Sequence, residues 1–273
     1  MTMRGDSDPG IPARGGDADL SVIGSILADR SRCKILLALA DGRALPASML
    51  AGEAGVSAAT TSAHLHKLCA AGLLEVFPEG RYRYYRLAGD EVGRLIEIVA
   101  RFSPTQPVRS PREGTRAHAI RLARCCYNHI AGGLGVAITA ALIERGCLTG
   151  GDGSADLGGV HRGRLVGGVR DEIAYQLTGV GRSTLGELGV ILPAENTVRC
   201  CVDWTEQRHH IAGPLGRALL DAFTGAGWLR RAERSRALIA TEAGKRSLHA
   251  YLGLHWPPAA VSAAPPAPSR LGP

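Results

Sequence analysis

"LAGEAGVSAATTSAHLHKLCAAGLLE", residues 50–75, has the pattern of two short helices joined by a tight turn. Gly55 suits the left-handed residue that ends the first helix, and Ser57 suits the N-cap of the second. One face of the expected second helix, Ser57 to Ala71, is apolar and carries Leu65, Leu68 and Cys69. The opposite face is expected to be exposed and carries short polar or basic side chains: Thr60, Thr61, His64 and Lys67.

The segments on either side extend this pattern over residues 20–102. Residues 21–42 carry apolar side chains at helical spacing, and a short helix is expected from Pro46 to Ala54. "LLEVFPEGRYRYYRL", residues 73–87, alternates as two strands around the turn Pro78-Glu79-Gly80, and residues 90–102 form a last helix. Helix, turn, helix and then a basic hairpin is the order of a winged helix-turn-helix.

Three segments of this region resemble a known family. "LADRSRCKILLALADG" (residues 27–42), the opening stretch and "EGRYRYYRL" (residues 79–87) are similar to the matching segments of the ArsR/SmtB family of bacterial repressors. The resemblance implies a homodimer that binds double-stranded DNA at an inverted repeat, with half-sites about one DNA turn apart. The apolar face Leu95, Ile96 and Val99 suits the dimer interface, although packing within one chain explains it equally well.

The candidate DNA contacts lie on the second helix of the motif and on the hairpin. In a winged helix-turn-helix this helix enters the major groove, where hydroxyl groups bind phosphates and base edges and basic side chains neutralise phosphates. A formal net charge of +7 suits such a polyanionic partner. The alternative is that Ser57 only caps the helix and Thr60 is solvated. The predicted contacts are Ser57, Thr60, Thr61, Ser62, His64, Lys67, Arg81 and Arg83.

The metal positions of the ArsR/SmtB family are not matched in this chain. The family's usual thiolate cluster falls where this chain reads "LPASMLA", residues 45–51, which has no cysteine. The other frequent site needs aspartate and histidine ligands on the last helix, and "DEVGRLIEIVARF", residues 90–102, has no histidine. Cys33 lies near a position that some relatives use, but one thiolate does not make a site. Any metal in this chain would therefore occupy a different site.

The second half of the chain contains an internal repeat. "HIAGGLGVAITAALIERGCL" from His129 and "HIAGPLGRALLDAFTGAGWL" from His210 share ten of twenty residues, and each copy follows an Arg-Cys-Cys triplet. Helical spacing gives each copy a buried stripe, and each copy leads to a short Thr-capped helix. We therefore predict a mainly α chain with small β-hairpin wings, in which residues 115–256 form an internally duplicated, winged-helix-like helical domain for sensing or dimerisation. The related faces of the two copies are expected to pack together.

The repeated cysteines and histidines are candidate ligands for a thiophilic metal or metalloid ion. Such an ion needs three or four soft ligands, so the two copies must meet for a site to form. Cys125 and Cys126 point in different directions on any regular element, so at most one of them shares a site with His129. Other interpretations stay open: redox-active thiols, cysteines that only pack as small apolar side chains, or an organic-ligand pocket beside Trp204. The candidate set is Cys125, Cys126, His129, Cys200, Cys201, His209 and His210.

Other function classes find less support in the sequence. "GGLG" follows no apolar strand, and no GxGxxG, HExxH or Ser-His-Asp spacing is present, so we predict no catalytic residues and no enzyme. A degenerate catalytic module fused to a regulator is one alternative, and a DNA- or partner-binding protein without a ligand is another. The sequence requires no cofactor.

The remaining segments are poor in core residues and mark the domain boundaries. Residues 1–19 are expected to form a disordered arm, 103–114 a linker, 149–168 a flexible loop, and 257–273 a Pro/Ala-rich disordered tail. No apolar run reaches the roughly 18 residues needed to span a membrane, and the N-terminus lacks the apolar core of a signal peptide. We therefore expect a cytoplasmic protein whose seven cysteines are reduced. The basic run Arg230, Arg231, Arg234 and Arg236 is either a second basic patch or a solvated hairpin.

Overall fold

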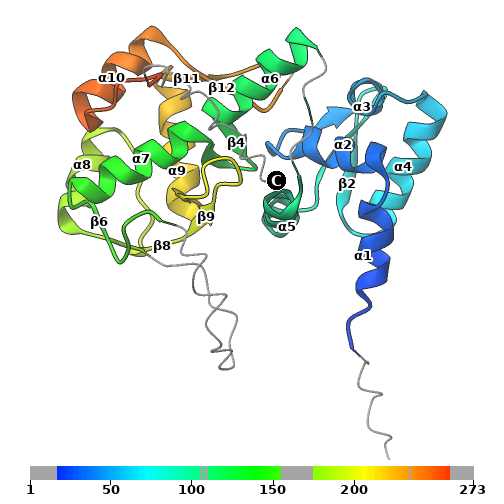
Figure 1. The fold of residues 1–273 in the computed structure, drawn as a ribbon, viewed down its shortest axis with the longest axis horizontal. Helices are drawn as coiled ribbons and strands as arrows, with labels where there is room; N and C mark the ends of the chain where they lie inside the picture. The colour runs from blue at the N-terminus through cyan, green and yellow to red at the C-terminus, as the bar shows by residue number, and fades with distance from the viewer. Residues whose placement is uncertain (1–16, 105–106, 108–109, 155–174, 234, 259–273) are drawn as a thin grey trace, which may run out of the picture.

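The computed structural model describes residues 17–104, 107, 110–154, 175–233 and 235–258. An N-terminal part and a C-terminal part lie side by side, with α5 (Asp90–Phe102) between them (Figure 1). Most of the predicted arm, tail and flexible loop, together with Arg234, lie outside the described residues. No helix in the described part of the chain is both long and apolar enough to cross a bilayer.

The N-terminal part is a winged helix-turn-helix with the predicted order of elements. The helical segment before the motif is interrupted at Asp29, whose carboxylate caps the next helix by accepting from the Arg32 N–H at 2.9 Å. A three-stranded antiparallel sheet has the order β1-β3-β2. The elements before α5 are α1 (Leu20–Leu27), α2 (Arg30–Leu39), β1 (Leu45–Pro46), α3 (Ala47–Ala54), α4 (Ala58–Ala70), β2 (Leu74–Glu79) and β3 (Tyr82–Leu87).

The turn between α3 and α4 has the predicted local chemistry. Gly55 has a φ of 73°, a left-handed conformation that a side chain would strain. Ser57 caps α4, its hydroxyl accepting from a backbone N–H of the first turn at 3.2 Å. These two residues set the direction in which α4 leaves the turn. The hairpin turn lies later than predicted, because Pro78 and Glu79 still pair within the sheet and the chain reverses only from Gly80.

The C-terminal part repeats one order of elements: strand, strand, helix, strand, strand, helix. Before them comes α6 (Pro111–Leu122), which begins inside the predicted linker, and β8 (Thr197–Val198) adds a strand beside β7. Each Cys-Cys pair lies in a strand that pairs with the histidine-bearing strand of its own copy. Strands alternate with helices throughout this part, so the chain is mixed helix and sheet. The prediction of a mainly α fold underestimated the strands. The first run is β4 (Arg124–Cys126), β5 (His129–Ala131), α7 (Gly133–Glu144), β6 (Leu148–Thr149), β7 (Tyr175–Leu177) and α8 (Gly179–Glu187). The second run is β9 (Cys200–Val202), β10 (His209–Ile211), α9 (Gly213–Gly225), β11 (Leu229–Arg231), β12 (Leu238–Ala240) and α10 (Glu242–Leu252).

The two runs of elements make equivalent contacts with each other. α7 packs on β10, and α9 packs on β5. A Cβ on Gly135 of α7 would lie 3.3 Å from the His210 Cβ, and one on Gly216 of α9 would lie 2.9 Å from the His129 Cβ. Each histidine-bearing strand thus crosses onto the helix of the other run. This exchange brings β5 and β10 into contact.

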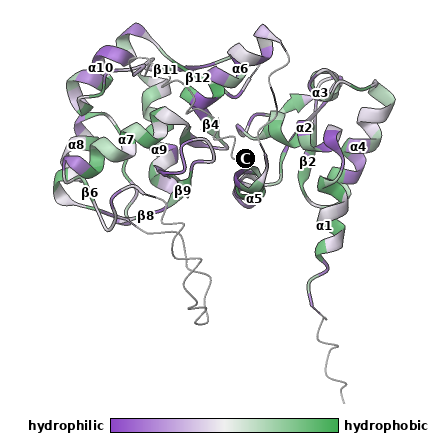
Figure 2. Cartoon of the chain, in the orientation of Figure 1, coloured by the Kyte–Doolittle hydropathy of each residue, from purple (hydrophilic) through white to green (hydrophobic). Residues whose placement is uncertain are grey.

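The stripes predicted on α7 and α9 lie in the core of the C-terminal part. α7 is hydrophobic along most of its length (Figure 2), because protein surrounds it. Each stripe residue is at most 3% exposed: Leu134, Ile138, Leu142, Leu215, Leu219 and Phe223. A separate core in the N-terminal part is built from leucine and isoleucine side chains of α2, α3, α4 and β3.

Arginine side chains join the two parts of the chain. The Arg43 guanidinium donates to a carbonyl of the β11–β12 hairpin at 3.0 Å, and Arg231 donates to the Asp41 carbonyl at 2.9 Å. Arg236 is 7% exposed and pairs with Glu97 on α5 at 2.6 Å. Neither alternative for the basic run, a second basic patch or a solvated hairpin, describes Arg231 and Arg236, because both make contacts between the two parts.

Candidate functional site

The predicted DNA-contacting face is the exposed side of α4 together with the β2–β3 hairpin. α4 presents hydroxyl groups in its first turns and a lysine further along, and arginines extend from the hairpin. The exposed members of the predicted set are Ser57, Thr60, Ser62, Lys67, Arg81 and Arg83. Because contact with DNA requires exposure, these six residues remain the candidate DNA contacts.

Two predicted DNA contacts face the protein instead. Thr61 is fully buried, and its hydroxyl donates to the Ser57 carbonyl at 2.9 Å. It lies four residues before the buried Leu65, so both side chains fall on the core side of α4. The His64 side chain is 13% exposed and its Nε2 lies 3.9 Å from the Asp29 carboxylate. The exposure predicted for Thr61 was wrong, and His64 faces α2 at the edge of the candidate surface.

Three of the seven predicted ligands come together in a buried Cys/His group. Cys126, His129 and His210 are at most 4% exposed, and one ligand atom from each lies within 4.8 Å of the other two. Cys126 and His129 face each other across the β4–β5 pair, so strand register brings them together. His210 comes from β10, and its Nε2 lies 3.2 Å from the His129 Nε2. The group therefore combines side chains from both runs of elements.

Both imidazoles of the Cys/His group have an oxygen beside the second ring nitrogen. The His129 Nδ1 lies 3.2 Å from the Asn128 Oδ1, and the Asn128 Nδ2 donates to the Asp90 carboxylate on α5 at 3.3 Å. The His210 Nδ1 lies 3.4 Å from the Asp203 carboxylate, an ion-pair distance without the geometry of a hydrogen bond. A proton on Nδ1, facing such an oxygen, leaves Nε2 of that ring as the metal-binding atom.

Cys201 and a small cavity complete the surroundings of the group. The Cys201 thiol is within hydrogen-bonding reach of Cys126, and this contact together with burial raises the pKa of the Cys126 thiol to about 12. The cavity has a volume of about 50 Å³ and lies between α5, the β4–β5 turn and the start of α9. Cys126, His129 and Cys201 are among the residues that line it, so the cavity adjoins the Cys/His group.

The other predicted ligands lie apart from the group. Cys125 points into the C-terminal core, where burial raises the pKa of its thiol to about 12, and Cys200 lies in the same core. Neighbouring residues of a strand face opposite sides, which separates each of these cysteines from the next one in sequence. The His209 Nδ1 pairs with the Tyr175 hydroxyl at 2.9 Å, and burial, together with the nearby His210, lowers its pKa.

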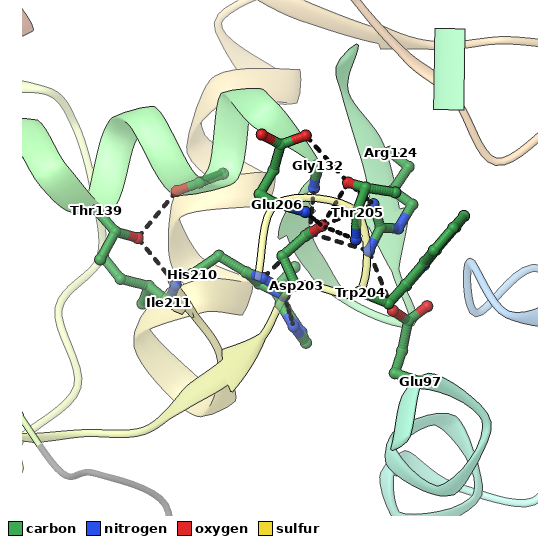
Figure 3. A network of polar contacts seen from close by, with 12 residues as sticks. Glu97, Arg124, Gly132, Thr139, Asp203, Trp204, Thr205, Glu206, His210 and Ile211 are labelled. Atoms are coloured by element: carbon green, nitrogen blue, oxygen red, sulfur yellow. Dashed lines mark hydrogen bonds and ion pairs between the residues drawn. The ribbon is translucent and has the colours of Figure 1, made fainter. Parts of the chain in front are cut away.

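A buried network of charges connects the Cys/His group to α5 (Figure 3). The fully buried Arg124 guanidinium lies 2.9 Å from the Asp203 carboxylate and 3.2 Å from the Glu97 carboxylate. Arg236 contacts the other oxygen of Glu97 at 2.6 Å. Asp203 also accepts from the Gly132 N–H at 2.7 Å, so this carboxylate links the residue after β9 to the start of α7.

Sequence reasoning did not predict this network of ion pairs. Arg124 belongs to the first Arg-Cys-Cys triplet. Its guanidinium lies 5.0 Å from the ring centroid of Trp204, the residue that one of the open interpretations placed beside an organic-ligand pocket. Glu97 adjoins the apolar face of α5, beside Ile96, and an acidic residue in that position is a signal for a buried ion pair. Asp203 gave no such signal, because an aspartate in a polar turn is ordinary.

We expect the stability of the fold to depend on the ionisation of Glu97. Burial would raise the pKa of this carboxyl, but Arg236 and Arg124 outweigh burial and lower the pKa from 4.5 to about 2. Because the folded-state pKa lies below the ordinary value, the carboxylate stabilises the fold above pH 4.5, and this contribution is lost as the pH falls toward 2. Urea unfolding of Glu97→Gln should show a smaller loss of stability between about pH 5 and pH 2.5 than the wild-type chain. Equal pH profiles would contradict this role.

Comparison with known proteins finds a family model and relatives. The model, described as a helix-turn-helix domain, matches residues 27–76. The uncharacterized HTH-type transcriptional regulator YdfF of Bacillus subtilis is 34% identical over 241 residues, which cover 86% of this chain and 98% of YdfF. The HTH-type transcriptional regulator CmtR of Mycobacterium tuberculosis is 35% identical over 100 residues, covering 35% of this chain and 84% of CmtR. A homodimeric winged helix-turn-helix DNA-binding domain from Mycobacterium bovis has 34% identity and a TM-score of 0.28, covering 32% of this chain and 86% of that chain.

The likeness to YdfF extends beyond the helix-turn-helix, because the aligned 241 residues include both parts of this chain. These relatives are named as transcriptional regulators, which agrees with the prediction that the chain is not an enzyme. The winged helix-turn-helix observed here is the fold that the sequence resemblance implied. This chain belongs to the ArsR/SmtB family of helix-turn-helix transcriptional regulators.

Proposed function

We propose that this chain is a repressor that binds an inverted-repeat operator as a homodimer and is released when a thiophilic ion binds its C-terminal part. The observation that carries the DNA-binding proposal is the surface formed by α4 and the hairpin, adjacent elements that both expose polar or basic side chains. The buried group of Cys126, His129 and His210 supports the ion as the releasing ligand.

In the proposed complex α4 enters the major groove of the operator. Its N-terminal end brings Ser57, Thr60 and Ser62 to phosphates and base edges, and the helix N-terminus adds N–H donors. Arg81 and Arg83 on the hairpin contact phosphates beside that groove. A two-fold dimer then reads two half-sites about one helical turn apart.

The proposed dimer interface uses apolar side chains that the described part of the chain leaves exposed. Leu20 on α1 is 79% exposed, and Ile98 and Phe102 on α5 are 50% and 82% exposed. Leu95 and Ile96, part of the face predicted for this role, pack into the N-terminal core instead. The outer residues of α1 and α5 therefore fit a two-fold interface better than the predicted face.

Operator binding should lose much of its salt dependence when basic groups of the candidate DNA surface are removed. The variant carries Lys67→Ala, Arg81→Ala and Arg83→Ala. Each phosphate contact that is lost should flatten the slope of log K against log salt by about 0.9, since fewer counterions are released on binding. Fluorescence anisotropy with an operator fragment, repeated from about 50 to 200 mM salt, measures both the affinity and the slope.

A second triple variant controls for the loss of three positive charges. Arg217, Arg230 and Arg246 are exposed side chains of the C-terminal part. Their replacement by alanine changes net charge equally but is expected to leave the salt slope nearly unchanged. A wild-type slope in the first variant, or equal flattening in both, would overturn the proposed docking of α4 and the hairpin.

A further inference from the structure

We infer that Cys126, Cys201, His129 and His210 form a site for a soft divalent metal ion, and that α5 responds to its occupant through two chains of polar contacts. The metal-binding half of this inference stands on the geometry of the C-terminal part. The regulatory half rests on the proposed repressor function.

The distance between the two imidazoles of the group fits a tetrahedral metal centre. Zn–N bonds of about 2.0–2.1 Å at the tetrahedral angle separate two ligand nitrogens by roughly 3.3–3.4 Å. The Nε2 atoms of His129 and His210 are 3.2 Å apart, and the Cys126 sulfur lies within 4.8 Å of the ligand nitrogens of both rings. Cys201 lies outside this three-residue group but contacts Cys126, which makes it the candidate for the fourth ligand. Three ligand atoms are therefore already gathered, and a four-ligand site requires the Cys201 sulfur to move toward the two imidazoles.

An oxygen atom faces the second nitrogen of each imidazole, as it does at many metal-bound histidines. Ligating histidines commonly donate Nδ1–H to a carboxylate or carbonyl oxygen, which orients the ring. Asn128 Oδ1 faces the His129 Nδ1, and the Asp203 carboxylate faces the His210 Nδ1, which has no hydrogen-bond partner although it is fully buried. With both protons on Nδ1, the two Nε2 lone pairs face each other. A cation between them stabilises that arrangement.

The charges of the four side chains suit a divalent ion. Two thiolates and two neutral imidazoles neutralise one divalent cation, so the complete centre has no net charge to desolvate. Cys126, His129 and His210 are at most 4% exposed, where a charged centre would be costly. Mixed sulfur and nitrogen ligands favour Zn²⁺ or Cd²⁺ over Mg²⁺ and Ca²⁺, which prefer oxygen.

Two chains of polar contacts connect the imidazoles to α5. The first consists of His129, Asn128 and Asp90. The second, visible in Figure 3, consists of His210, Asp203, Arg124 and Glu97. Asp90 and Glu97 are seven residues apart, so the two chains of polar contacts reach the same side of α5 about two turns apart. A change at either imidazole is therefore passed to one face of the helix that separates the two parts.

The β4–β5 turn couples the same ligands to α5 by direct packing. Tyr127 donates its N–H to a carbonyl at the end of α2 at 2.7 Å, and a Cβ on Gly93 of α5 would lie 3.0 Å from the Tyr127 Cβ. The turn consists of Tyr127 and Asn128 alone, with Cys126 and His129 at its two ends. An ion that draws these ligands together moves the turn that holds α5. A shift of α5 in each protomer changes the spacing of the two α4 helices and lowers operator affinity.

Metal binding is measured on the full chain, reduced and without DNA. Titration with Cd²⁺ or Zn²⁺, followed by elemental analysis after desalting, should give one ion per chain. Cys126→Ser with His129→Asn should abolish this stoichiometric binding. The matched control, Cys33→Ser with His118→Asn, removes a thiol and an imidazole outside the group and should retain one ion. Wild-type chain without a stoichiometric ion, or the same loss in the control, would overturn the site.

Coupling is measured as the ratio of operator dissociation constants with and without saturating Cd²⁺. In the wild-type chain this ratio should be about tenfold or more, within the usual range of about 5–150-fold for allosteric effectors. Asn128→Ala should still bind one ion, with affinity weakened by about 10–100-fold because His129 loses its orienting partner. Its operator ratio at saturation should be clearly smaller than that of the wild-type chain, because one of the two chains of contacts to α5 is broken. Asn196, the only other asparagine of the chain, gives the control Asn196→Ala, which should behave as wild type.

The possible failures of the two proposals differ in these measurements. An unchanged operator ratio in Asn128→Ala would overturn the coupling through this turn, while the ion stoichiometry would still establish the site. A chain that binds one ion but no operator at any ion concentration would overturn the repressor proposal and the coupling together. Operator binding that is tight, salt-dependent and unaffected by both ions would agree with the proposed DNA binding, but would overturn both the proposed release by a thiophilic ion and the coupling inferred here.

Discussion

Replacing Arg124 by methionine is expected to lower the free energy of unfolding by about 3–5 kcal/mol, because it breaks a buried ion pair from one side only. The guanidinium is fully buried and lies 2.9 Å from the Asp203 carboxylate and 3.2 Å from that of Glu97. Methionine keeps much of the packing against Trp204 but carries no charge. Asp203 is then left in the interior without its arginine. Urea unfolding at neutral pH measures the change.

An exposed arginine provides the matched control. Arg86 pairs with Glu75 at 2.8 Å, and the two side chains are 52% and 50% exposed. Arg86→Met should change the free energy of unfolding by less than about 1 kcal/mol, as is usual for surface pairs. Adding Asp203→Asn to Arg124→Met should recover part of the loss, since it removes the unpaired charge. If Arg124→Met cost no more than Arg86→Met, the buried network would not stabilise the fold.

The winged helix-turn-helix was predictable because short stretches of sequence encode it. Gly55 and Ser57 fix the turn by backbone conformation and capping, which act within a few residues. The wrong prediction that Thr61 is exposed also has a cause within a few residues. Threonine is polar, so its position next to Thr60 suggested exposure, but its hydroxyl bonds to the Ser57 carbonyl four residues earlier. A threonine that satisfies its own hydroxyl within the helix can be buried.

The strands of the C-terminal part were not predictable from periodicity. β4, β5, β9 and β10 have three residues each, which is too short to establish the alternation of a strand. The repeat indicated that His129 and His210 hold equivalent positions. It did not show that their Nε2 atoms face each other, because that contact depends on how the two runs of elements pack. Alternation along β4 separates Cys125 from Cys126 only once the strand is known.

The charge network needed tertiary structure for a different reason. Arg124 is 27 residues from Glu97 and 79 residues from Asp203 along the chain. Local patterns indicate that an acidic group beside an apolar helix face needs a partner, but they do not identify it. Partners this distant are known only once folding brings α5, the first residue of β4 and the residue after β9 together. The sequence therefore indicated a buried ion pair only at Glu97.

Adding a methyl group at Gly135 or Gly216 is expected to destabilise the chain by about 1–3 kcal/mol or more, because both helices approach backbone too closely for a side chain. A Cβ on Gly135 would overlap the Ile130 carbonyl oxygen, and one on Gly216 would lie 2.6 Å from the Ile211 carbonyl oxygen. These oxygens belong to strands and cannot rotate away as a flexible side chain does. Urea unfolding of Gly135→Ala and of Gly216→Ala measures the loss of stability. Because Gly216 also lies against the His129 Cβ, Gly216→Ala should weaken Cd²⁺ binding as well.

The control for Gly216 lies on the same helix. A Cβ on Gly225 meets nothing within 4 Å, so Gly225→Ala should be neutral or stabilise the chain by up to about 1 kcal/mol. Both substitutions exchange the same residue types on α9, so the difference between them reports chiefly the contact of Gly216 with β10 and His129. Equal stabilities of the two variants would show that α9 and these strands can accommodate a Cβ at Gly216. A large difference in stability together with unchanged Cd²⁺ affinity would show that close packing of the two runs is needed for the fold but does not position the imidazoles.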